Sequence, residues 1–261
     1  MAPLVAIGGI HVPADAIGPL ERGLQDICAR VGLPPAEQFK WSPGKKEVFL
    51  RNELKDEARR DFFLALLRAA ADFNATACVV IVDTKAAHAS KKAATSEDDA
   101  TILFLERCEW ALGQVGRDGL VVVAGVSGGV RDEAKFLETC IAVVAEGTEY
   151  LTPKRMPLGV ITVPSRRLRL LQLADLVTSC ATARVSGESQ YSPTIFEALK
   201  PLLRTDGERI GGIGLKIHPD FKYGNLYHWL LRDTHFWKYQ TGHLMPPKGI
   251  GYFDGPREAK N

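Results

Sequence analysis

Apolar and polar positions follow two spacings along the chain, and these spacings predict alternating strands and helices. Short runs rich in β-branched residues are typical of buried strands, and apolar residues at every third or fourth position are typical of amphipathic helices. Strands are expected at 4–12, 76–82, 120–124, 160–163 and within 207–220, and helices at 14–31, 53–73, 96–115, 132–145, 165–184, 195–203 and 226–237. This alternation predicts one α/β domain over residues 1–245, followed by a loosely ordered tail at 246–261.

The stretch 159–184 is the most informative part of the chain. A short strand at 160–163 precedes Ser165, whose hydroxyl is expected to cap the next helix. That helix is apolar over most of its circumference, which is typical of a buried helix. Asp175 shares its narrow polar stripe with Ser165, Gln172 and Ser179. A carboxylate there is expected to be partly desolvated, and it would then need a cation, a donor network or a metal ion.

Two arginines, Arg166 and Arg167, are expected in the first turn of the same helix. The positive end of the helix dipole mildly disfavours cations, whereas a bound phosphate would make their position useful. The alternative hypothesis is that the polar stripe is an ordinary solvent face and that both arginines point into water.

The segment 37–46 combines three lysines with two aromatic residues. Cations beside aromatic rings suit contacts with phosphates and stacking on bases. The candidate nucleic-acid contacts are therefore Lys40, Trp41, Arg166, Arg167 and Gln172. The alternative is a packed tryptophan with solvated lysines.

Charge and composition restrict the classes of function. The chain has 33 basic and 31 acidic residues and a net charge of +2, so any nucleic-acid contact must come from a local patch. The five cysteines form no CxxC pair, which favours a reduced cytoplasmic protein over a disulfide or zinc framework. No apolar run reaches the roughly 18 residues of a membrane span, so no membrane partner is expected.

Two further segments follow apolar strands. Asp83 comes directly after the strand at 76–82, and ligands of open α/β sheets gather at the carboxyl ends of strands. The alternative is that Asp83 begins a turn or caps a helix. The glycine-rich turn at 125–129 could cradle a phosphate, although its spacing fits neither of the common phosphate-binding motifs.

Four stretches together resemble the domain-of-unknown-function family 3800, whose members are thought to have a ribonuclease-H-like fold. They are Leu4–Pro13, Phe39–Trp41, Gln172–Val177 and Gly214–Pro219. The resemblance implies an α/β fold with a ribonuclease-H-like mixed sheet flanked by helices. It also implies hydrolysis of phosphodiesters by Mg²⁺ or Mn²⁺ bound to converging carboxylates. Asp175 matches the family's last acidic position, and Asp83 is the second candidate for a catalytic and metal-binding residue.

The chain departs from the family pattern at two places. The family usually opens with a strand that ends in an Asp-Glu-Ser-Gly motif, whereas this chain begins at what resembles the second strand. An acid that often follows the strand at 120–124 is replaced by Gly125. The fold is thus expected to lack or replace the usual first strand, which would leave neighbouring strands with unpaired backbone groups.

Three hypotheses for the function follow. The first is a metal-dependent nuclease-like protein with an incomplete acidic site. The second is a catalytically inactive relative that binds nucleic acid or a protein partner. The third is an unrelated small-molecule enzyme that uses the turn at 125–129.

Overall fold

An antiparallel pair of strands lies at the centre of the fold. Strands β1 (Leu4–His11) and β2 (Thr76–Asp83) pair over their full length, from Leu4 opposite Asp83 to His11 opposite Thr76. A shorter strand, β5 (Leu215–His218), runs parallel to β2, so the order in this mixed sheet is β1-β2-β5. This computed structural model describes residues 4–44, 54–125, 129–157, 159–207, 209–233, 235–238 and 241–244.

The remaining described strands form two separate sheets. Strands β3 (Val121–Ala124) and β4 (Val160–Val163) pair in parallel, and β6 (His235–Lys238) and β7 (Thr241–Leu244) form an antiparallel pair. Neither pair is hydrogen-bonded to the β1-β2-β5 sheet. The five strands predicted from the sequence are therefore present, but they are divided between two sheets, and the third sheet, β6–β7, was not predicted.

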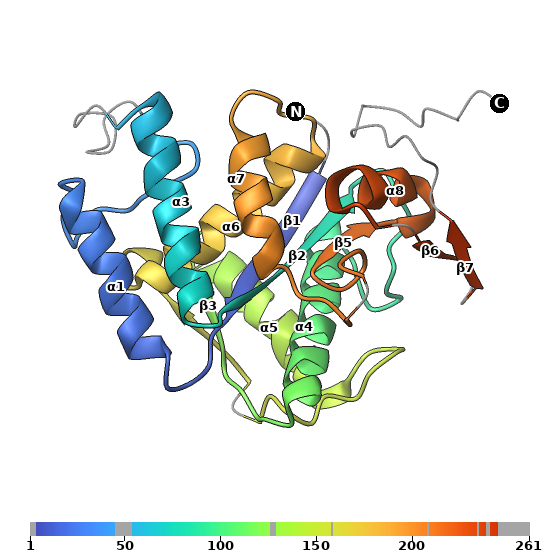
Figure 1. Cartoon of the computed structure of the whole chain (residues 1–261). Coiled ribbons are helices and arrows are strands. Elements are labelled where there is room, and N and C mark those ends of the chain that lie inside the picture. Colours follow the sequence, from blue (N-terminus) through green and yellow to red (C-terminus); the bar gives the residue numbers. More distant parts are fainter. Residues whose placement is uncertain are drawn as a thin grey trace.

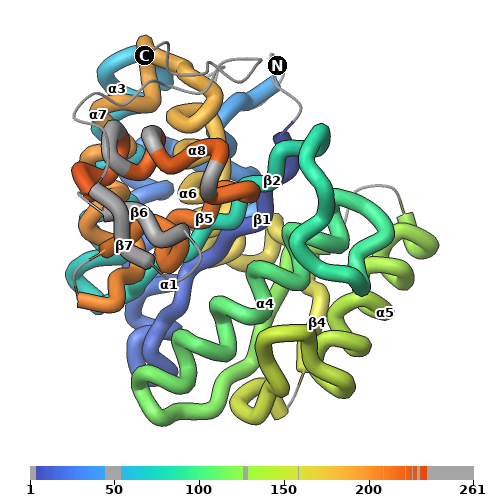
Figure 2. Tube along the Cα trace, turned by 90° about the vertical axis from the view of Figure 1, so that its right-hand side faces the viewer, coloured from blue at the N-terminus to red at the C-terminus, as the bar shows by residue number. Residues whose placement is uncertain are grey.

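Helices cover both faces of the central strands (Figures 1 and 2). One face carries α1 (Ile17–Arg30), α3 (Asp56–Asp72), α6 (Arg169–Val185) and α7 (Ser192–Leu199). The other face carries α4 (Ser96–Val115) and α5 (Val130–Glu146). The largest apolar core lies on the α6 face, while α4 separates two smaller cores, one towards β2 and one towards α5. The expected α/β class with a mixed sheet flanked by helices is confirmed.

The glycine pair in β1 lets helices approach the strand closely from both sides. A Cβ atom on Gly8 would lie 2.5 Å from the Thr178 hydroxyl of α6, and one on Gly9 would lie 3.0 Å from the Phe104 ring of α4. Successive residues of a strand point to opposite faces, so these two contacts place α6 and α4 on the two faces of β1. The pairing with β2 continues through both glycines without a bulge.

Two predicted helices differ substantially from the structure. Residues 165–167 form a separate 3₁₀ turn, η1 (Ser165–Arg167), and α6 begins only at Arg169. The helix predicted at 96–115 is confirmed as α4, and its N-cap is Thr95. The helix predicted at 226–237 is replaced by other elements: α8 (Asp220–Leu226) and the π turn η3 (Tyr227–Leu231) precede β6, and η2 (Lys200–Leu202) extends α7.

The cysteines, the absence of an apolar run long enough for a membrane span and the C-terminal tail were also subjects of prediction. All five cysteines are free thiols, and four of them are buried. Within the described part of the chain, no helix is both long and apolar enough to cross a bilayer. The tail predicted at 246–261 lies outside the described residues, as do residues 126–128 of the glycine-rich turn.

Candidate functional site

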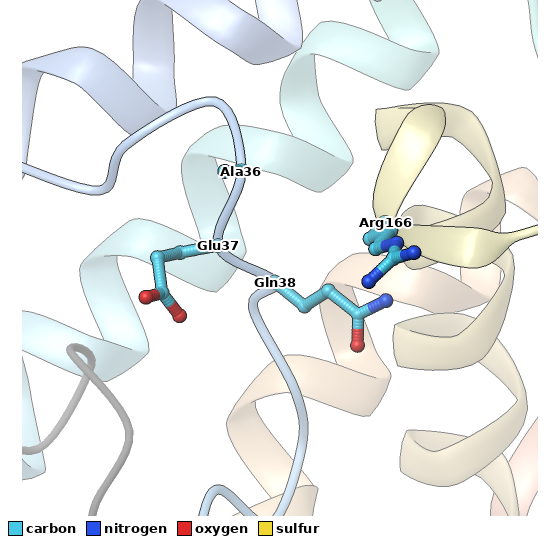
Figure 3. Close-up of a pocket in the computed structure, with 4 residues that line it drawn as sticks. All are labelled: Ala36, Glu37, Gln38 and Arg166. Carbon is cyan, nitrogen blue, oxygen red and sulfur yellow. The ribbon is translucent and has the colours of Figure 1, made fainter.

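A loop between α1 and α3, residues 34–44, lies against the start of α6 (Figure 3). Arg169 holds the loop in place from the first turn of α6. Its side chain is only 3% exposed and donates hydrogen bonds to the backbone carbonyls of Pro34 (2.8 Å) and Glu37 (2.5 Å) and to the Gln25 side chain (2.9 Å). A buried guanidinium is stable only when its donors are satisfied, so this network fixes the loop relative to the helix.

Gln172 completes the attachment of the loop. Its side-chain oxygen accepts hydrogen bonds from Arg169 (2.8 Å) and from the backbone N–H of Phe39 (3.3 Å), and its nitrogen donates to the carbonyl of Ser165 (3.1 Å). Gln172 is 2% exposed. Its amide is thus used inside the protein and is not placed to contact nucleic acid directly, contrary to the sequence-based expectation.

The positive end of the α6 dipole is already bound to a carboxylate. The two oxygens of Glu21 accept the backbone N–H groups of Arg169 (2.7 Å) and Leu170 (2.9 Å). Ser165 makes no capping bond and instead accepts a hydrogen bond from the Gln38 side chain (2.7 Å). Glu21 therefore occupies the α6 terminus that a phosphate would need. The predicted combination of a phosphate bound at this terminus and two arginines in the first turn of the helix is wrong.

The two arginines remain on the surface. Arg166 and Arg167 lie in η1, both are exposed, and neither has a hydrogen-bond or ion-pair partner for its guanidinium among the described residues. Arg166 borders a hollow of about 320 Å³ that is also lined by Ala36, Glu37 and Gln38. Figure 3 shows the Gln38 carboxamide turned towards Arg166 and the Glu37 carboxylate turned away from it. The Arg166 guanidinium is thus the charged donor at this hollow, beside a Gln38 amide nitrogen that already donates to Ser165.

Trp41 is packed against the protein. Its ring stacks on Phe63 with centroids 5.7 Å apart and planes inclined by 13°, and it meets the Tyr191 ring edge-on at 6.3 Å. The side chain is half-buried. These contacts favour the packed-tryptophan hypothesis, with Trp41 anchoring the loop that carries Lys40.

Asp175 lies one turn before Thr178 on α6 and is exposed. Partial desolvation raises the pKa of its carboxyl group, while the charge of Lys40 and a hydrogen bond from Ser179 act in the opposite direction. Asp175 thus keeps contact with solvent. The partial desolvation, the nearby cation and the hydrogen-bond donor agree with the partly desolvated carboxylate expected from the sequence. The charge of Lys40 acts on Asp175, so these two predicted site residues are close together.

Asp83 has quite different surroundings. Its side chain is 1% exposed and accepts hydrogen bonds from the Lys222 ammonium (2.6 Å), the Tyr223 hydroxyl and the backbone N–H of Lys85 (3.0 Å). Burial alone would raise the pKa of Asp83, but these bonds and the Lys222 charge together lower it. Lysine and tyrosine donors thus already occupy this carboxylate.

The described residues do not fit a Mg²⁺ or Mn²⁺ site. Such an ion needs several oxygen ligands, and no group of three or more His, Cys, Asp or Glu side chains in the described ranges is placed to hold one. Lys40 and Ser179 influence the pKa of Asp175, whereas Lys222, Tyr223 and Lys85 influence that of Asp83, so the two acids share no partner among these groups. The metal-binding and catalytic roles of both acids therefore stay predictions, and no reaction step is derived from them.

The residues that build this site were only partly found from the sequence. Gln172 and Arg166 lie near the start of α6, and the charge of Lys40 acts on Asp175 further along the same helix, but Glu21, Gln38 and Arg169 were missed. Nothing local marks Glu21, which lies 148 positions before the backbone group it binds. Arg169 had one weak signal, a charged residue within an otherwise apolar helix.

Comparison of the chain with known protein families, with curated proteins and with solved structures finds no match.

Proposed function

We propose that this protein binds the sugar-phosphate backbone of nucleic acid through a basic patch formed by Lys40, Arg166 and Arg167. The observation that carries the proposal is the pair of exposed arginines on η1, with no partner for either guanidinium in the part of the chain that the structure describes. Guanidinium groups bind phosphate oxygens in a bidentate manner and hold their charge at every physiological pH.

The buried network beneath the patch supports the same function. The loop that carries Lys40 is fixed by Arg169 and Gln172, and η1 is joined to it by the Gln38–Ser165 hydrogen bond. A surface whose backbone is already held in place loses little conformational entropy on binding. The hollow beside Arg166 gives a phosphate oxygen a place between a guanidinium and a carboxamide.

A ribonuclease-H-like arrangement of β1-β2-β5 and β3–β4 is our finer proposal for the fold. It is supported by the mixed β1-β2-β5 sheet and by the separate parallel pair β3–β4, which no strand of the described ranges joins to that sheet. Cleavage of nucleic acid has less support than binding, because Asp83 is paired with Lys222 and Asp175 is a surface acid next to Lys40. We therefore propose that the protein binds nucleic acid without cleaving it.

The test is a salt titration of binding to a labelled oligothymidylate strand. Arg166→Ala combined with Arg167→Ala is expected to weaken binding and to flatten the plot of log K against log salt. For a single strand each lost phosphate contact reduces the slope by about 0.7, so the expected change is about 1.4. The matched control is Arg117→Ala with Arg131→Ala, which removes the same charge from exposed sites elsewhere and should leave the slope close to that of the unmodified protein.

An equal slope in both double variants would overturn the proposal, because the binding would then depend on net charge alone. The titration is repeated with EDTA and with Mn²⁺. Binding to the patch is expected to be the same in both. Cleavage of the strand with Mn²⁺ that is lost in Asp175→Ala would instead establish the nuclease hypothesis.

A further inference from the structure

Strand β1 has one edge without a partner strand in the described ranges. It is the outermost strand of the β1-β2-β5 sheet, and all eight of its residues are partly exposed although helices cover both of its faces. The backbone N–H of Val79 donates to Gly214 on the β5 side of β2, so Val79 faces away from β1. Because strand residues alternate, the neighbours of Val79, such as Val80, face β1.

The register then identifies the unpaired backbone groups. Val80 lies opposite Ile7, so Ile7 and every second residue from it point their N–H and C=O groups towards β2. The other set points to the free edge. It consists of Leu4, Ala6, Gly8 and Ile10. These four residues offer donors and acceptors at the spacing of a β-ladder.

The edge has none of the usual protection against strand addition. Natural edge strands carry a charge, a proline or a bulge, or they are very short. The sequence of β1, LVAIGGIH, contains no lysine, arginine, acid or proline, and its pairing with β2 runs through eight residues without a bulge. Such an edge is a template for another strand.

We propose that the free edge of β1 binds an extended segment of a partner polypeptide by β-strand addition. Main-chain hydrogen bonds to Leu4, Ala6, Gly8 and Ile10 hold the segment, as in other complexes of this type. Helices α4 and α6 pack on the two faces of β1, so the segment that extends this sheet is uncharged and apolar on the faces that meet these helices. Close approach of α6 at Gly8 favours small side chains at that level.

A second copy of this chain does not fit the same edge. Helix α6 packs mainly over β1 rather than over β2. Direct pairing of two β1 strands would place the strands about 4.8 Å apart and would bring the two α6 helices to a similar separation. Packed helices need about 8–10 Å between their axes. A lone extended segment carries no helices and meets no such obstacle.

The experiment is hydrogen exchange of the β1 amides, measured by NMR on the full chain. Leu4, Ala6, Gly8 and Ile10 are expected to exchange at least about tenfold faster than Val5, Ile7 and Gly9, which bond to β2. The probe is a capped peptide of about eight valine and alanine residues flanked by lysines, long enough to span β1. It is expected to slow the four edge amides about tenfold or more.

Two controls make the result specific. The same peptide with prolines at its centre lacks the necessary N–H donors and should give no protection. Ala6→Pro in the protein removes an edge donor while sparing the β2 ladder, so it should abolish the effect of the peptide without loss of the fold.

Three outcomes would overturn the proposal. Without the peptide, the four edge amides could exchange as slowly as the amide of Ile7 at every protein concentration. That result would mean that another part of the same chain covers the edge. They could become protected only as the protein concentration rises, which would identify a second copy as the occupant. They could exchange rapidly in the presence of the peptide, which would mean that the edge accepts no strand.

Discussion

Two carboxylates near the carboxyl ends of β2 and β5, the buried Asp83 and the partly exposed Asp220, are each joined to a lysine and a tyrosine. Asp83 accepts hydrogen bonds from Lys222 and Tyr223, both on α8. A second group of the same composition consists of Lys216, Asp220 and Tyr227. A buried ion pair is retained when further donors satisfy the remaining lone pairs, and here the tyrosine hydroxyls do so. Both groups attach α8 to the edge of the sheet.

The Asp83 pair makes stability depend on pH. Because the folded protein lowers the pKa of Asp83 below its ordinary value of 3.8, ionised Asp83 stabilises the fold above that pH. This contribution is lost as the pH falls through the lowered pKa. Asp83→Asn is expected to cost about 2 kcal/mol at pH 7, and the gap to the unmodified protein should narrow below pH 3.8. Urea unfolding at several pH values measures both effects.

Asp118→Asn is the control for this prediction. The Asp118 carboxylate is 65% exposed and lies 3.6 Å from Arg155, and surface pairs of this kind contribute about 0–1 kcal/mol. A gap for Asp83→Asn that stays constant between pH 7 and pH 2 would contradict the assigned role of Asp83.

The bounds of helix α4 were predicted from the sequence, whereas the contacts that its acids make with distant loops were not. Glu97, Asp98 and Asp99 lie in its first turn, where acids commonly complement the helix dipole. Asp99, which is 0% exposed, instead binds the backbone N–H groups of Ala89 and Ser90, and Glu109 binds those of Lys154 and Arg155. Two loops that are distant in sequence are thus fastened to one helix.

The start of α4 allows a test with adjacent residues. The Thr95 hydroxyl accepts the N–H of Asp98 (3.1 Å), and the Asp98 carboxylate accepts the N–H of Thr95 (3.0 Å), which is a capping box. Thr95→Ala is expected to destabilise the protein by about 1 kcal/mol. Ser96→Ala lies inside the first turn and should change stability by less than about 0.5 kcal/mol. Equal losses in the two variants, measured by urea unfolding, would argue against the capping box.

At the scale of the whole molecule, α6 and β1 form the contact around which both helix layers are arranged. That contact requires glycine at position 8, because a Cβ atom there would lie 2.5 Å from the Thr178 hydroxyl. Asp175 and Gln172 lie on the same helix, so the geometry of the candidate site depends on the same contact.

Gly8→Ala is expected to destabilise the protein by about 1–3 kcal/mol through overpacking. Thr178→Ala removes the oxygen that clashes, so the double variant should recover part of the loss. Thermal unfolding of the four proteins in a double-mutant cycle gives the coupling between the two sites. Additive effects would show that the clash lies elsewhere, for example at Val79, whose methyl group is 3.0 Å from the same Cβ position.

Local spacing determined where the elements lie. The β-branched runs at 76–82 and 160–163 are strands, and the amphipathic segments became α1, α3 and α5 with small shifts at their ends. The boundary of α6 was missed because Glu21, a distant residue, binds its first N–H groups, and a local pattern contains no record of such a partner. The sequence also located Lys40, Arg166 and Arg167, because polar residues in a loop or turn stay at the surface.

The sequence by itself thus determined the order of strands and helices as far as β5 and the positions of the surface cations, since both depend on residues close together along the chain. Only the tertiary structure decided that Gln172 is buried, that Asp83 forms an ion pair with Lys222 and that the strands divide into separate sheets. These facts depend on contacts between residues more than a hundred positions apart. The free energy of such contacts comes from burial and pairing, which one-dimensional spacing does not encode.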